Sequence, residues 1–79
     1  MMITYDNCEV GHYMKIISLD IWYAKITKVY RCYNLTEIWY KSFTTDGSLA
    51  EKEGYFLSSN DTRTVEFYDD EVQFNLIKA

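Results

Sequence analysis

The sequence predicts a mainly β protein, built as a small single-domain antiparallel sheet or partly open barrel that could include one short helix. Two observations lead to this fold class. β-Branched and aromatic residues crowd positions 16–33, and apolar and polar residues alternate in the C-terminal third. Fourteen of the 79 residues are aromatic, and each large ring can bury ~150–250 Å². Because no stretch resembles a linker, we treat residues 1–79 as one domain.

Residues 16–33 fit two kinds of secondary structure. On a helical wheel, the apolar side chains from Ile16 to Tyr33 form one continuous arc opposite Lys25, Lys28 and Arg31, which favours a helix. The segment is nevertheless dominated by Ile, Trp, Tyr, Thr and Val, which favour strands. We prefer strands on this composition. The alternative is an α+β fold, with a helix at about 18–33 packed on a C-terminal antiparallel sheet.

Residues 34–57 carry competing local signals. Asn34-x-x-Glu37 could cap a helix over residues 34–43, although the residue types again favour a strand. Asp46-Gly47 predicts a hairpin with arms at 39–45 and 49–57. Ser48-x-x-Glu51, followed by Gly54, instead has the form of one capped helical turn. Both readings of this loop stay open, and residues 55–57 are a further strand candidate.

The C-terminal third has the clearest alternation. Val65 and Phe67 alternate with polar residues over positions 62–68, and Val72, Phe74 and Leu76 do so over 72–76. Period-two alternation is typical of half-buried strands. The sequence therefore predicts two strands joined by an acidic turn at residues 69–71.

Charge is divided unevenly along the chain. Residues 1–41 hold five cations and four acids, a net charge of +1, whereas residues 42–79 hold three cations and eight acids, a net charge of −5. The whole chain has a net charge of −4. Such segregation defines a candidate surface, although acidic faces also serve solubility.

No residue pattern indicates an enzyme or a cofactor site. His12 is the only histidine, and we interpret it as a polar loop residue because no partner for general-base chemistry is evident. Cys8 and Cys32 fit no C-x-x-C pattern, so we expect reduced, buried thiols. The acids at 69–71 lack the spacing of a calcium loop, and we expect no metal site. With neither a membrane-length apolar run nor a secretion signal, the expected location is the cytoplasm.

The acidic half predicts a partner-binding surface. The candidate residues are Glu66, Tyr68, Asp69, Asp70 and Glu71. Closely spaced acids attract the basic groove of a nucleic-acid-handling protein and speed association, while an aromatic side chain can anchor the interface. Being short, acidic, tyrosine-rich and without catalytic groups, the chain resembles in composition the small inhibitor and immunity proteins encoded by phages and other mobile elements. This resemblance implies a module that blocks a partner's basic surface, as anti-defence proteins do, in the host cytoplasm if a phage encodes it.

Two other function classes stay in view. If residues 21–33 form one regular strand, Tyr23, Lys25, Arg31 and Tyr33 share its odd face, and rings interleaved with cations are what a single-stranded nucleic-acid site needs. The net charge of −4 opposes such binding, because it repels a polyanion. The third class is a structural subunit of an assembly, held by exposed aromatic residues.

Overall fold

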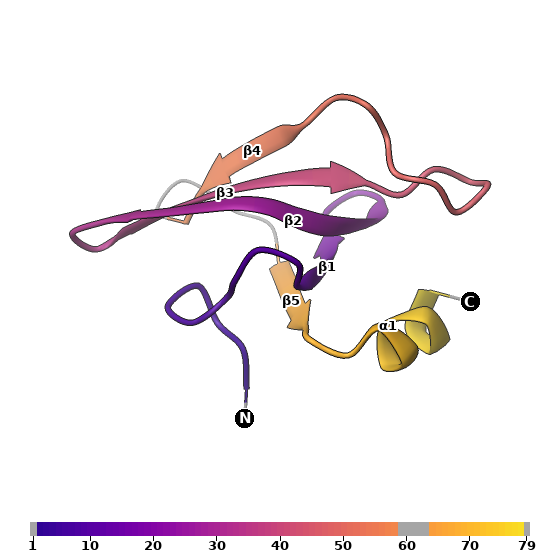
Figure 1. The fold of residues 1–79 in the computed structure, drawn as a ribbon, viewed down its shortest axis with the longest axis horizontal. Coiled ribbons are helices and arrows are strands. Elements are labelled where there is room, and N and C mark those ends of the chain that lie inside the picture. The colour runs from indigo at the N-terminus through magenta and orange to yellow at the C-terminus, as the bar shows by residue number, and fades with distance from the viewer. Residues whose placement is uncertain (1, 59–63, 79) are drawn as a thin grey trace.

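The computed structural model describes residues 2–58 and 64–78, apart from the side chain of Phe56. Within these residues, one open antiparallel sheet is followed by a short C-terminal helix, which confirms the predicted mainly β fold (Figure 1). The strands lie in the order β4-β3-β2-β1-β5. The elements are β1 (Tyr13–Ile17), β2 (Ile21–Cys32), β3 (Leu35–Ser42), β4 (Gly54–Leu57), β5 (Thr64–Tyr68) and α1 (Glu71–Lys78).

Residues 16–33 form strands, so the alternative helix at about 18–33 is not adopted. The segment is divided by a tight turn, in which the amide of Ser18 donates to the carbonyl of Asp20 at 3.0 Å. β2 then pairs with β1 on one side and with β3 on the other. β1 pairs with β5 on its other side, so both strands are flanked by two neighbours. β-Branched and aromatic side chains pack well against such neighbours, which suits this composition better than a helix does.

A bulge interrupts the pairing of β2 with β3. Ile26 lies opposite Tyr40, but Lys28 lies opposite Trp39, so Thr27 is the extra residue. An extra residue moves every later side chain of a strand to the other face of the sheet. Lys25 and Lys28 consequently share one face, whereas a regular strand would place them on opposite faces.

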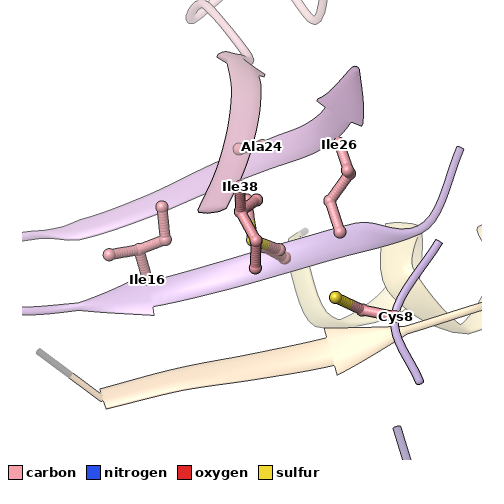
Figure 2. Packing of buried hydrophobic residues seen from close by; sticks show 6 residues of the cluster. Cys8, Ile16, Ala24, Ile26 and Ile38 are labelled. Carbon is pink, nitrogen blue, oxygen red and sulfur yellow. The ribbon is translucent and has the colours of Figure 1, made fainter. Parts of the chain in front are cut away.

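The core lies between one face of the sheet and the N-terminal segment. Met14, Ile16, Ala24, Ile26 and Ile38 are buried on this face, and Cys8 reaches it from residues 2–12 (Figure 2). Partly buried side chains surround them: Ile3, Tyr5, Val29, Tyr40, Val65 and Phe67. This apolar layer therefore joins β1, β2, β3 and β5 to the N-terminal segment.

Arg31 fastens the N-terminal segment to the sheet. Its guanidinium donates to the carbonyl of Tyr5 from Nη2 at 2.9 Å and to that of Cys8 at 2.7 Å. Thr36 donates a further hydrogen bond to the carbonyl of Tyr5 at 3.3 Å. These bonds supply donors to backbone carbonyls in a segment that has no regular secondary structure of its own.

The loop after β3 follows the hairpin interpretation at its tip. The amide of Thr44 donates to the carbonyl of Ser48 at 2.8 Å, and Gly47 adopts a φ of 88°, which favours glycine. The Ser48 side chain donates to Asp46 at 2.7 Å instead of capping a helical turn. The hairpin arms are shorter than predicted, because an isolated bridge between Phe43 and Leu49 is followed by irregular chain until β4 begins at Gly54.

The C-terminal prediction is half correct. β5 forms as expected over its described residues and pairs with β1, whereas residues 62 and 63 lie outside the described chain. The predicted strand at 72–76, and with it the hairpin turn at 69–71, is wrong, because Glu71–Lys78 is helical. Val72 and Leu76 also fit the helical i, i+4 spacing, and the helix ends carry Glu71 and Lys78, charges that suit its dipole.

The structure also addresses membrane crossing. Its described residues contain no helix with the length and apolar character needed to span a bilayer.

Candidate functional site

The acidic residues predicted to bind a partner lie together where β5 passes into α1. Glu66, Asp69, Asp70 and Glu71 are all exposed. Tyr68 is partly buried, and its hydroxyl donates to Glu66 Oε1 at 3.0 Å. Burial, and then the hydrogen bond to this carboxylate, raise the pKa of Tyr68. The structure therefore brings the predicted residues close together. Tyr68 is partly buried, and its hydroxyl is hydrogen-bonded within the protein.

Asp70 has a defined structural role in this cluster. Its Oδ1 accepts hydrogen bonds from the amides of Val72 at 2.8 Å and Gln73 at 3.3 Å. An aspartate in this position satisfies the free amides of the first helical turn and places negative charge at the positive end of the helix dipole. Asp70 thus caps the start of the helix. Asp69 and Glu71, its neighbours in the chain, are exposed to solvent.

Phe74 attaches α1 to the sheet. It is fully buried and lies among four rings: Tyr13 at 4.7 Å between centroids, Tyr23 and Phe43 at 5.8 Å, and Tyr68 at 6.0 Å. At the end of the helix, Lys78 Nζ lies 3.9 Å from the centroid of Phe43. These contacts are on the sheet face opposite the core, so α1 and the N-terminal segment cover different faces.

Two apolar side chains of α1 were not identified as functional from the sequence. Val72 is 70% exposed and Leu76 is 75% exposed. Being four residues apart on a helix, they lie on one side of it. The alternation of residues 72–76 directed the prediction toward a strand, in which both would have shared the buried face with Phe74. The i, i+4 spacing was the signal that could have found them.

The four residues of the alternative nucleic-acid site do not form one surface. Tyr23 and Lys25 lie on the face that carries α1, and Lys25 Nζ is 5.6 Å from the Tyr13 ring centroid. Beyond the bulge, Arg31 lies on the core face and binds the N-terminal segment. Tyr33 is fully exposed in the turn between β2 and β3, at a φ of 56°.

The cysteines and the histidine take different positions. Cys8 is a free, buried thiol whose pKa is raised by desolvation. Cys32 is free but exposed, so the prediction that both thiols are buried is wrong for Cys32; it follows the bulge, near the end of β2. His12 lies in a loop and accepts a hydrogen bond from the amide of Glu9 at 3.0 Å. Within residues 2–58 and 64–78, no three acidic, Cys or His side chains are grouped to hold a metal.

Comparison with known proteins does not place the chain in a family. No family model, curated protein or solved structure matches it. Function is therefore inferred from the geometry and charge of the described residues.

Proposed function

We propose that the protein is a small binding module whose docking surface is the acidic helix surface, formed by Glu66, Asp69, Glu71, Val72 and Leu76. The observation that carries this proposal is the exposure of Val72 and Leu76, at 70% and 75%, on the short helix that follows the acids in the chain. Interfaces commonly pair an apolar centre with a polar rim, and two apolar side chains one helical turn apart can enter a single groove.

The charge of this surface identifies the kind of partner. Asp69 and Glu71 are exposed, and Glu66 accepts one hydrogen bond from Tyr68 and is otherwise open to solvent. The chain carries a net charge of −4. These acids would steer the protein toward a basic surface and raise the association rate, an effect that weakens with salt. The partner we propose is a protein whose apolar groove is bordered by Lys and Arg, as on a nucleic-acid-handling complex.

The biological role that fits such a module is inhibition. By occupying a basic surface that normally contacts nucleic acid, the protein would act as an inhibitor or immunity-type protein, comparable to phage-encoded anti-defence proteins. It would do so in the cytoplasm, that of the host if a phage encodes it. Val72 and Leu76 replace Tyr68 as the proposed anchors, because Tyr68 packs against Phe74.

A pull-down from host-cell lysate over a salt series tests the proposal. The variant E66Q/D69N/E71Q should release its partner at lower salt than the unmodified protein, because it lacks the three rim charges but keeps the Asp70 cap. The matched control E9Q/D20N/E51Q removes three exposed acids elsewhere and should retain the partner. The variant V72A/L76A should weaken binding at every salt concentration. Equal retention by all four proteins would contradict the proposal.

A further inference from the structure

A second surface combines lysines with aromatic rings on the sheet face that carries α1. We define the lysine–aromatic face as Lys25, Lys28, Lys41, Trp39 and Tyr55. The bulge after Ile26 brings Lys28 to the same face as Lys25, and Lys41 lies directly opposite Lys25 in the β2–β3 register. Helix α1 covers another part of this side of the sheet, where Phe74 contacts Tyr13, Tyr23, Phe43 and Tyr68. Lys28 and Tyr55, farther along the sheet, remain exposed.

The rings of this face are held in a fixed arrangement. Trp39 and Tyr55 are adjacent across β3 and β4, with centroids 4.9 Å apart and planes inclined by 20°. Lys28 Nζ lies 5.6 Å from the centroid of Trp39, and the indole of Trp39 donates to Glu37 Oε1 at 2.6 Å. Trp39 is thus held between Lys28 and Tyr55. Tyr55 lies on the outer strand β4 and is 56% exposed.

Lys25 lies over the Tyr13 ring and Lys28 over the Trp39 ring, and these contacts offset only part of the repulsion among the lysines. Like charges directly opposite each other destabilise an antiparallel sheet, and Lys25 and Lys41 form such a pair. Two carboxylates lie on or near this face and keep their charge: Glu37 accepts a hydrogen bond from the Trp39 indole, and Glu53 accepts one from the Thr27 hydroxyl. Among the residues that the structure describes, none forms an ion pair with Lys25, Lys28 or Lys41. An anion bound between the ammonium groups would relieve this repulsion.

We propose that the lysine–aromatic face binds single-stranded nucleic acid, a function beyond the protein-binding role proposed for the acidic helix surface. Side chains paired directly across two strands have Cβ atoms ~4.5–5.5 Å apart, so Lys25 and Lys41 can bracket one phosphate. Lys28 contacts the next phosphate of the nucleic acid, and an unstacked base lies on the exposed face of the Tyr55 ring. Stacking on an exposed ring selects single strands over a duplex, whose bases are already stacked. Stacking on Tyr55 also favours a nucleic acid over an acidic peptide, because a poly-acidic peptide carries negative charge but no bases.

Fluorescence anisotropy with a labelled 20-mer of deoxythymidine tests this assignment, beginning at ~50 mM salt. Binding should weaken with salt with a log–log slope of about −2, since each of three phosphate contacts contributes ~0.7. Tyr55→Ala should weaken binding about 5- to 150-fold, and K28Q/K41Q should reduce the magnitude of the slope. Tyr33→Ala and Lys52→Gln, exposed residues outside the face, are the matched controls and should leave binding unchanged. K28R/K41R, which keeps the charges, should bind as the unmodified protein does.

Three results would overturn the assignment. They are a lack of binding at low salt, equal affinity for a duplex or a poly-glutamate peptide, and equal effects of Tyr55→Ala and Tyr33→Ala. Far-UV circular dichroism of each variant shows whether a loss of binding comes from unfolding. The two proposals fail separately, because E66Q/D69N/E71Q should leave oligonucleotide affinity equal or higher while it weakens partner binding.

Discussion

Replacing Phe74 with alanine should release helix α1 and lower the free energy of unfolding by about 3 kcal/mol. Phe74 is the one buried residue of a helix only eight residues long. Isolated helices shorter than ~12–15 residues are marginal in water, so α1 depends on its attachment to the sheet. Truncation of a buried Phe costs ~3–5 kcal/mol. We expect the lower end of that range, because a surface helix can detach or collapse into the space that the ring leaves.

Urea denaturation and amide hydrogen exchange measure the two parts of this effect. The urea midpoint should fall, and the amides of residues 74–78 should lose protection while those of β1 and β2 keep theirs. Leu76→Ala is the matched control on the same helix; because Leu76 is 75% exposed, its effect should stay within ~0.5 kcal/mol. A loss below ~1 kcal/mol for Phe74→Ala, or unchanged protection of the helix amides, would refute the view that Phe74 holds α1 in place.

Three further predictions concern the helix cap and two turns. Asp70→Ala should destabilise the protein by about 1 kcal/mol in urea denaturation, because it removes the acceptor of two helix amides; no change would exclude this capping role. Tyr33→Asn should stabilise it by about 0.5–1 kcal/mol, because Tyr33 is fully exposed and Asn tolerates its positive φ better; a fall in the urea midpoint would count against backbone strain at this turn. Hydrogen bonds, first from the Thr44 hydroxyl and then from Ser48, lower the pKa of Asp46 from 3.8 to about 2. The carboxylate therefore stabilises the turn fully above pH 3.8, and this contribution is lost as the pH falls through about 2; an NMR titration of Asp46 with a midpoint near 3.8 would contradict it.

Local patterns predicted the strands but not the surfaces that they form. The composition of residues 16–33 favoured strands, which β1 and β2 confirm. A regular strand would have joined Lys25 with Arg31, yet the bulge after Ile26 sends Arg31 to the core face, where it binds the N-terminal segment. A bulge has no strong local signature, because it depends on which partner strand accepts the extra residue.

The candidate site shows the same division. The acids from Glu66 to Glu71 could be identified from charge segregation alone, because they need only be close in sequence to be close in space. Val72 and Leu76 belong to that surface only when residues 72–76 are helical, whereas their alternation predicts a strand. Their exposure follows from the helix, and the helix depends on the rings that pack around Phe74.

The sequence by itself favoured an antiparallel sheet, since strand preference depends on residues a few positions apart; alternation predicted β5 correctly but gave the wrong element at residues 72–76. It also determined where the negative charge gathers. Only the tertiary structure decided that residues 71–78 are helical, because both periodicities fit so short a segment and the choice depends on rings from β1, β2, β5 and the loop after β3 that surround Phe74. It likewise decided which lysines share a face, since one extra residue in β2 reverses the orientation of every side chain that follows.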